Sequence, residues 1–278
     1  MKFTKMNGIG NDYIYINGFE EKGDDPSALA IKLSYRHFSV GSDGVIIILP
    51  SKVADFRMRM FNADGSEGKM CGNGTRCVAK YVYEKGLTDK TCVTLETLAG
   101  IKTLDMDVED GVVKSVSVQM GKADFKASDV PVIFGGDEMV SQKLSLECGE
   151  WVITCVSMGN PHCVTFVNDT KSLDLEKIGP QFEHNPIFPE RVNTEFIKVI
   201  DDATLEMRVW ERGSGETLAC GTGACASVAA AVKNGICEMN KEITVRLLGG
   251  DLKITCGSDY SITMRGPAEF SYEGEVNI

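Results

Sequence analysis

The chain has 278 residues, of which 43% are hydrophobic and 25% charged, a composition that excludes a disordered chain and is typical of a folded globular protein. Its formal net charge of −11 would repel a phosphate backbone, so we expect no nucleic-acid partner. The length favours about two domains, each with its own core.

The start of the chain does not resemble a secretory signal, because Asn7, Asn11 and Asp12 interrupt any apolar segment there. The longest apolar stretches, Val45–Leu49 and Ala224–Val232, are far too short to span a bilayer. We therefore expect a cytoplasmic protein without a membrane partner.

Two helices are predicted along the chain, over Thr75–Lys85 and Ala224–Lys233, each closed by a glycine, Gly86 or Gly235. The second contains mostly alanine and valine, so we expect other elements to enclose it.

Strands are predicted where apolar and polar residues alternate, as at Val116, Val118 and Met120 and again over Thr204–Trp210. The predicted fold is α+β, with two domains that each wrap a strand-rich curled sheet around one buried helix.

An internal repeat supports this division, because five blocks of sequence recur at a constant offset of 149 residues. We expect duplicated domains: an N-terminal domain over 1–120, to which 266–278 return, and a C-terminal domain over 121–265. The matched blocks are Gly10-Asn11 with Gly159-Asn160, Met58-Arg59 with Met207-Arg208, Glu67 with Glu216, Cys71-Gly72-Asn73-Gly74 with Cys220-Gly221-Thr222-Gly223, and Gly86 with Gly235.

The repeated C-G-x-G turns indicate chemistry. A cysteine at the start of a helix lies beside unpaired backbone N–H groups and the positive end of the helix dipole, which favour its thiolate. The neighbouring N–H groups can bind an anion such as a carboxylate. With Cys71 on one face of an α-carbon and Cys220 on the other, one thiol could remove a proton and the other deliver one, which predicts an amino-acid racemase or epimerase.

A single C-G-x-G turn would more simply be a tight loop with a buried thiol, and the duplication favours catalysis. We expect the other eight cysteines to be core residues with reduced thiols. The cysteine spacings and the absence of H-E-x-x-H argue against a metal site.

Several motifs along the whole chain resemble the diaminopimelate epimerase family. They are Lys5-Met6-Asn7-Gly8-Ile9-Gly10-Asn11-Asp12, Phe61-Asn62-Ala63-Asp64-Gly65-Ser66-Glu67 before Cys71, Ser157-Met158-Gly159-Asn160-Pro161-His162, Pro189-Glu190-Arg191-Val192-Asn193, Glu211-Arg212-Gly213 before Cys220, and Gly266-Pro267-Ala268-Glu269.

The resemblance implies two barrel-like domains of the diaminopimelate epimerase-like fold, a substrate in the cleft between them, a homodimer, and no cofactor, neither pyridoxal phosphate nor metal. The expected reaction converts LL-2,6-diaminopimelate to the meso isomer in lysine and peptidoglycan-precursor biosynthesis.

The resemblance also assigns site residues. Cys71 and Cys220 would be the acid/base pair, and His162 and Glu211 would support the thiols and the α-ammonium group. Backbone N–H groups of Gly72-Asn73 and Gly221-Thr222 would bind the reacting carboxylate. Substrate-binding positions at the distal head would be Asn11, Asn62, Asn160, Asn193 and Arg212, residue types that can hold a zwitterion.

One position departs from the family pattern, since some members carry Gln where this chain has Gly44. Gly44 is therefore left out of the expected site.

Two alternatives stay open at this point. A proline or hydroxyproline racemase-like enzyme also uses paired cysteines, but its substrate would leave Asn62, Asn193 and Arg212 without an evident target. A non-catalytic amino-acid-binding protein or redox sensor would not need the two cysteines on opposite faces of a carbon.

Overall fold

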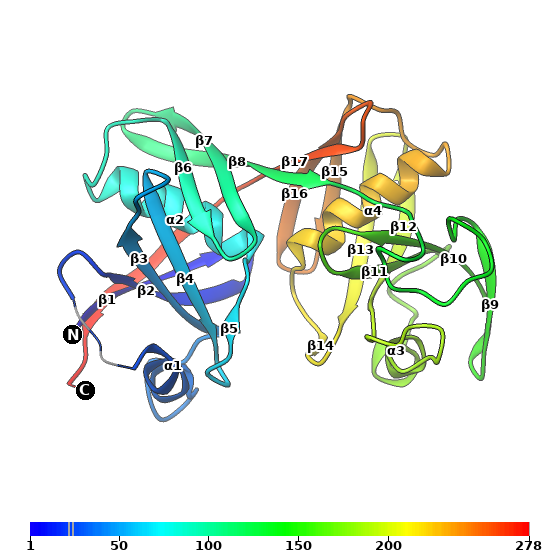
Figure 1. The fold of residues 1–278 in the computed structure, drawn as a ribbon, viewed down its shortest axis with the longest axis horizontal. Coiled ribbons are helices and arrows are strands. Elements are labelled where there is room, and N and C mark those ends of the chain that lie inside the picture. Colours follow the sequence, from blue (N-terminus) through cyan, green and yellow to red (C-terminus); the bar gives the residue numbers. More distant parts are fainter. Residues whose placement is uncertain (22, 24, 278) are drawn as a thin grey trace. The chain divides into compact units, whose positions relative to one another are not determined.

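The computed structural model describes residues 1–21, 23 and 25–277, and the chain divides into two compact units (Figure 1). Unit 1 comprises Met1–Gln119 with Arg265–Ile278, and unit 2 comprises Met120–Met264. The chain leaves unit 1 within strand β8 (Val112–Lys122) and returns within β17 (Ser261–Gly266). Both crossings are therefore extended strands rather than loose loops.

Unit 1 is a mixed sheet with two helices. Its strands pair in the order β18, β1, β2, β3, β4, β6, β7 and β8, and β5 forms a short hairpin with β4. The bounds are β1 (Lys2–Gly8), β2 (Asn11–Asn17), α1 (Pro26–Ser34), β3 (Gly44–Pro50), β4 (Phe56–Asn62), β5 (Glu67–Gly68), α2 (Gly72–Glu84), β6 (Cys92–Thr97), β7 (Gly100–Glu109) and β18 (Glu269–Glu275).

Unit 2 is built in the same way. Its strands pair in the order β9, β10, β11, β12, β13, β15 and β16, and β14 forms the short hairpin with β13. The bounds are β9 (Gln142–Leu146), β10 (Gly149–Ser157), β11 (Pro161–Phe166), α3 (Leu175–Glu183), β12 (Asn193–Asp201), β13 (Thr204–Glu211), β14 (Gly215–Glu216), α4 (Gly221–Lys233), β15 (Glu242–Leu247) and β16 (Gly250–Cys256).

The two units share strand order, and they share register at one parallel strand pair. In unit 1 the parallel pair β2 and β3 sets Tyr13 opposite Gly44, and in unit 2 the parallel pair β11 and β12 sets His162 opposite Asn193. Both residues of the second pair lie 149 positions after those of the first. The sequence repeat therefore corresponds to a structural repeat at this strand pair.

Helices α2 and α4 occupy equivalent places and are buried along almost their whole length, α2 as far as Val82. Figure 1 shows α2 among the strands of unit 1 and α4 among those of unit 2. Both begin three residues earlier than the sequence predicts, because the glycines after each cysteine are already helical. Each ends at a C-cap followed by Gly86 or Gly235 at φ +71°, the left-handed conformation that glycine adopts readily.

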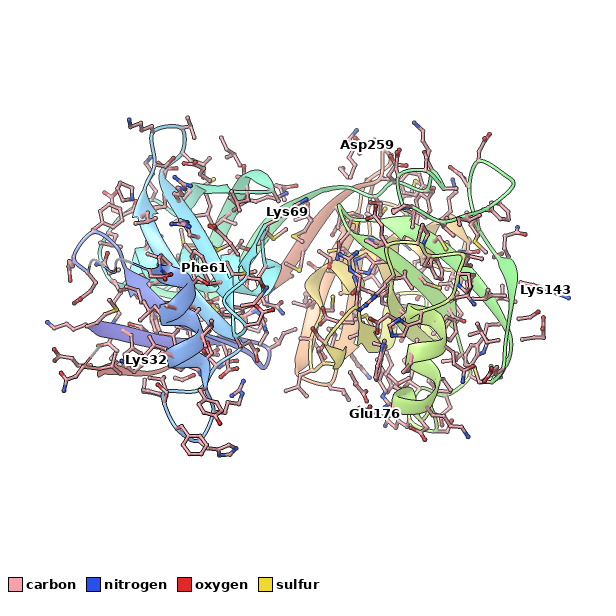
Figure 2. All side chains as sticks on the ribbon, turned by 60° about the horizontal axis from the view of Figure 1, so that its bottom comes forward. Lys32, Phe61, Lys69, Lys143, Glu176 and Asp259 are labelled. Carbon is pink, nitrogen blue, oxygen red and sulfur yellow. The ribbon has the colours of Figure 1, made fainter. Side chains whose placement is uncertain are left out.

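The other face of each sheet is covered by a shorter helix. In unit 1, α1 packs against β3 and β4 over a core that includes Phe61, and in unit 2, α3 packs against β12 and β13. Figure 2 shows Phe61 inside unit 1, while Lys143 and Glu176 point away from the ribbon of unit 2. The strand-rich α+β fold with a helix enclosed in each of two domains is confirmed.

Most cysteines outside the two turns lie in the core, as expected. Six of the eight are buried, but Cys92 is exposed at the start of β6 and Cys148 is only partly buried, so the expectation was wrong for these two. Across the described residues, no helix combines the length and apolar character needed to cross a membrane.

Candidate active site

The first C-G-x-G turn makes Cys71 the N-cap residue of α2. Its backbone is extended, and its sulfur accepts the N–H of Gly74 at 3.4 Å. The thiol donates to Oδ1 of Asn11 at 3.2 Å. Asn11 therefore lies directly beside the Cys71 sulfur.

An ionic network holds the Asn11 amide in this orientation. Asp43 Oδ2 accepts from Asn11 Nδ2 at 2.8 Å and from the N–H of Asp12 at 3.0 Å, while Asp43 Oδ1 accepts from Arg36 at 2.9 Å. Burial opposes ionisation of Asp12, but hydrogen bonds from Arg36 and Lys5 lower the pKa of its carboxyl. The carboxylate of Asp43 thus leaves Asn11 only its oxygen to present to the thiol.

The second turn makes Cys220 the N-cap residue of α4, with its sulfur accepting the N–H of Gly223 at 3.4 Å. Thr222 Oγ1 lies 3.6 Å from the sulfur. Glu211, at the end of β13, also hydrogen-bonds the thiol and accepts from Thr217 Oγ1 at 2.5 Å. Where Cys71 has a neutral amide as its partner, Cys220 has a carboxylate.

The environment of Cys220 differs from the sequence-based expectation of a thiolate. Burial, followed by the charges of Glu211 and Glu195, raises the pKa of this thiol well above its ordinary value. The thiol is only 5% exposed, so desolvation outweighs the Gly223 N–H at the helix terminus. Burial likewise raises the pKa of Glu211. The resting protein therefore keeps the proton on Cys220.

His162 and Asn160 lie next to this turn. His162 is fully buried on β11, and its Nε2 lies 3.1 Å from Asn160 Oδ1. Asn160 Nδ2 donates to Thr222 Oγ1 at 3.4 Å. His162, Asn160, Thr222 and Cys220 thus form one chain of contacts within unit 2.

The structure adds one residue that sequence reasoning missed. Glu195 on β12 is fully buried, and its Oε1 lies 2.7 Å from Nδ1 of His162. A Cβ atom on Gly223 would lie 2.7 Å from the same oxygen. In the sequence, an acidic residue among apolar strand residues was the available signal, because such a residue is rarely buried without a partner.

Two of the expected distal-head residues are joined to each other. Asn193 is buried, its Oδ1 accepts the N–H of Arg212 at 2.8 Å, and its Nδ2 donates to Pro161 O at 3.2 Å. The guanidinium of Arg212 is exposed and donates to Glu190 O at 2.9 Å. Backbone contacts thus fix the Asn193 amide, while the Arg212 charge stays at the surface of unit 2.

The remaining residues expected at the site lie in their units as follows. Asn62 ends β4 and donates to Ser66 Oγ at 3.0 Å. Asn73 is buried in the first turn of α2, where Oδ1 accepts from Arg76 at 3.0 Å. Gly72 and Gly221 are the first residues of α2 and α4, positions whose N–H groups have no acceptor within the helix.

Gly44 is sterically required. A Cβ atom there would lie 2.1 Å from Phe61 O and 2.7 Å from a ring carbon of Tyr13. A glutamine at this position would need a different backbone path.

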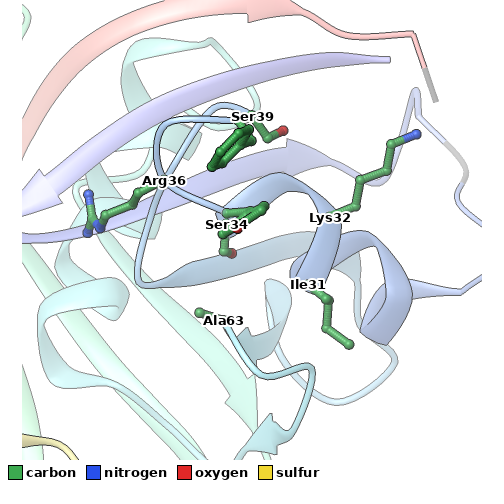
Figure 3. Close-up of a pocket in the computed structure, with 8 residues that line it drawn as sticks. Ile31, Lys32, Ser34, Arg36, Ser39 and Ala63 are labelled. Carbon is green, nitrogen blue, oxygen red and sulfur yellow. The ribbon is translucent and has the colours of Figure 1, made fainter.

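A surface pocket lies elsewhere on unit 1, between α1 and the loop that follows it (Figure 3). It encloses about 600 Å³ and is lined by Ile31, Lys32, Ser34, Tyr35, Arg36, Phe38, Ser39 and Ala63. None of the expected site residues lines it. Within the described ranges, no three His, Cys, Asp or Glu side chains gather as metal ligands.

Comparison with known proteins gives one family. The family model described as diaminopimelate epimerase matches residues 3–126 and 154–271. A diaminopimelate epimerase from Acetivibrio thermocellus is 53% identical over 279 aligned positions, covering 100% of this chain and 99% of the relative.

Two solved structures share the fold at low sequence identity. A phenazine biosynthesis protein of the PhzF family from Bacillus anthracis has a TM-score of 0.73 at 20% identity, over 100% of this chain and 99% of that one. A hydroxyproline epimerase from Agrobacterium vitis, solved with trans-4-hydroxy-L-proline, has a TM-score of 0.71 at 16% identity, over 99% of this chain and 90% of that one.

Proposed function

The chain belongs to the diaminopimelate epimerase family, and on that premise we propose that it converts LL-2,6-diaminopimelate to the meso isomer without a cofactor, using Cys71 and Cys220 as its two bases. The observation that carries this proposal is the pair of N-cap cysteines. Each sulfur accepts an N–H bond at 3.4 Å from the glycine three residues on, and both stand at equivalent positions of a duplicated fold.

The reaction inverts an α-carbon by moving protons. One cysteine removes the α-proton as thiolate, the other delivers a proton to the opposite face, and the two exchange roles in the reverse direction. The raised pKa of Cys220 keeps that thiol protonated, as a proton donor requires, and Cys71 acts as the base once it has lost the proton that it donates to Asn11 in the resting protein. Glu211 accepts from the Cys220 thiol and holds its proton in place.

The developing negative charge needs stabilisation, because an α-proton is very weakly acidic. First-turn N–H groups of α2 and α4, at Gly72-Asn73 and Gly221-Thr222, carry the positive end of a helix dipole. In the proposed complex they bind the reacting carboxylate and lower the barrier electrostatically.

The second amino-acid head of the substrate accounts for the remaining polar residues. We assign Asn11, Asn62, Asn160, Asn193 and Arg212 to substrate binding. The exposed Arg212 guanidinium can bind a carboxylate through two parallel N–H bonds. Asn193 supports this role because its Oδ1 fixes the backbone of Arg212 at 2.8 Å.

Further parts of the proposal follow the family. Unit 1 and unit 2 are the two epimerase domains. The enzyme is a homodimer of the cytoplasm, takes only a small-molecule substrate, and acts in lysine and peptidoglycan-precursor biosynthesis.

The direct experiment incubates protein freed of metal and pyridoxal phosphate with LL-diaminopimelate and follows the meso isomer. We expect turnover by the wild type, loss of at least about 100-fold in Cys71→Ala and Cys220→Ala, and unchanged turnover in Cys92→Ala, whose thiol is exposed at the start of β6. Absence of turnover by the wild type contradicts the proposal.

Substrate choice provides a second test. Lysine lacks the second carboxylate and would leave Arg212 unpaired in the complex, and polar sites reject such analogues strongly. We expect poor turnover of lysine and of trans-4-hydroxy-L-proline. Turnover of hydroxyproline comparable with that of LL-diaminopimelate would favour the racemase-like alternative.

A further inference from the structure

Unit 2 contains a buried imidazole–carboxylate pair in which both side chains are 0% exposed. Nδ1 of His162 lies 2.7 Å from Oε1 of Glu195. The two residues come from neighbouring parallel strands, with Val164 opposite Glu195 and His162 two residues earlier on the same face of β11. Among the residues that the structure describes, none gives a hydrogen bond to the other carboxylate oxygen, Oε2. His162 is thus the only described hydrogen-bond partner of this buried carboxylate.

The structural repeat shows that the fold does not require this pair. At the equivalent positions of unit 1, 149 residues earlier, stand Tyr13 and Ile46, both buried. Ile46 also occupies the same place relative to its helix. A Cβ atom on Gly74 would lie 2.7 Å from Ile46 Cδ1, and one on Gly223 would lie 2.7 Å from Glu195 Oε1. The same framework is therefore stable with an apolar side chain where unit 2 buries a carboxylate.

The hydrogen-bond partners of the His162 ring indicate how many protons it carries. Asn160 turns its Nδ2 toward Thr222 Oγ1, at 3.4 Å, and so presents Oδ1 to His162 Nε2 at 3.1 Å. Both ring nitrogens of His162 thus face acceptor oxygens, the pattern of a doubly protonated imidazolium. A buried carboxylate is stabilised when a cation pairs with it, and His162 is the side chain placed to supply that cation.

The charges of Glu195 and His162 act on groups of the Cys220 turn. Glu211 on β13 and the Cys220 thiol at the start of α4 both feel the charge of Glu195, which disfavours their ionised forms. The charge of His162 acts on Glu211 in the opposite sense. Cys163, next to His162 on β11, is a buried thiol that also feels Glu195. A proton on His162 would offset a negative charge that otherwise lies beside two proton carriers.

We infer that Glu195 is a positioning residue, which holds His162 as an imidazolium with Nε2 on Asn160 and so fixes the Asn160–Thr222–Cys220 chain of contacts. Its importance for turnover rests on the proposed function, whereas the state of His162 does not. A substitution of Glu195 should therefore change His162 first and activity through it.

Nuclear magnetic resonance tests the state of His162 directly, because the chain has only three histidines. Ring ¹⁵N labels in the substrate-free protein at assay pH should show both His162 nitrogens protonated. In Glu195→Gln, one of the two ring protons should be lost. Glu195→Ile places the unit 1 residue in the same framework and keeps the test available if the glutamine variant folds poorly.

A matched control is Glu206→Gln. Glu206 is a partly buried carboxylate on β13 that accepts from Thr170 and faces away from His162, so the His162 ring signals should stay as in the wild type. A neutral His162 in the wild type, or unchanged His162 signals in Glu195→Gln, overturns the inference.

Kinetics separates positioning from simple destabilisation. We expect Glu195→Gln to lower kcat by about 10- to 100-fold, as for other groups that orient a functional imidazole, with KM and the melting temperature little changed. An unchanged kcat overturns the role in turnover. If the His162 signals behave as expected but the wild type fails to epimerise LL-diaminopimelate, the ion pair stands and the proposed function falls.

Discussion

The thiol of Cys71 donates to Asn11 Oδ1 at 3.2 Å, and a hydrogen bond on the other side of that amide fixes its orientation. Asp43 accepts from Asn11 Nδ2 at 2.8 Å. A neutral amide held by a carboxylate thus stands beside the sulfur that we propose as the first base.

Removing the support of Asn11 should reduce catalysis more than stability. In Asp43→Ala the Asn11 amide loses the partner that fixes its orientation, and with it the substrate-binding position that we assign to Asn11, so kcat/KM should fall by about 10- to 100-fold, as for the loss of a hydrogen bond to a charged group. Asp55→Ala is the control. Asp55 is held by Lys90 and Thr94, whose hydrogen bonds lower its pKa to about 2, and its loss should leave kcat/KM unchanged. Equal losses in both variants would contradict the role of Asp43.

The two helix starts should respond differently to the same substitution. In Gly223→Ala the new methyl group would lie 2.7 Å from Glu195 Oε1 and 3.3 Å from the Cys220 sulfur, whereas in Gly74→Ala it meets the mobile end of Ile46 and stays 3.7 Å from the Cys71 sulfur. We expect steady-state assays to show a much larger loss of kcat in Gly223→Ala. A larger loss in Gly74→Ala would argue against the importance of the Glu195 environment.

The Cys220 thiol should react slowly with alkylating agents. Burial and two nearby carboxylates raise its pKa, so less thiolate is present than in an unfolded chain, and this difference in thiolate fraction is largest between the unfolded and folded pKa and closes as the pH passes the folded pKa. Peptide mapping after iodoacetamide treatment should show much slower modification of Cys220 in native than in urea-unfolded protein.

The variant Glu211→Gln separates charge from accessibility in this experiment. Removing one carboxylate lowers the pKa of Cys220 and should speed its alkylation at fixed pH, although the site is no more open. Slower or unchanged modification would show that access alone protects the thiol.

The repeated Arg and Glu form the same ion pair in both units, with different surroundings. Arg59 donates to both oxygens of Glu67 at 2.7 and 3.0 Å, and Arg208 to both oxygens of Glu216 at 2.7 and 2.9 Å. Arg208 also donates to two carbonyls of the loop before α3, at 2.7 and 2.8 Å.

The ion pairs predict unequal effects on stability. Urea denaturation should show that Arg208→Ala lowers the free energy of unfolding by about 2 kcal/mol, because two partly buried carbonyls lose their donor. Arg59→Ala should cost less than about 1 kcal/mol, as is usual for partly exposed pairs. The reverse order would show that the loop contacts of Arg208 contribute little.

The repeat, the two C-G-x-G turns and the helices that follow them could be predicted from the sequence, because these features depend on local spacing. It could not show Glu195 as the partner of His162, since that contact depends on which strands pair and in what register. It also predicted a thiolate at Cys220 from the helix terminus alone. This preference is reversed by burial among the surrounding strands and by the charges of Glu211 and Glu195, and both effects depend on the tertiary structure.

Deuterium labelling tests the two-base account most directly. LL-diaminopimelate is incubated with the enzyme in deuterated water, and both isomers are isolated after a small fraction has reacted. Because one thiol takes the substrate proton and the other delivers a solvent-derived deuteron, the meso product should carry deuterium at the inverted carbon, and the recovered LL isomer should carry almost none. Early meso product without deuterium, or LL isomer labelled as fast as the product, would contradict the assignment of one cysteine to each face.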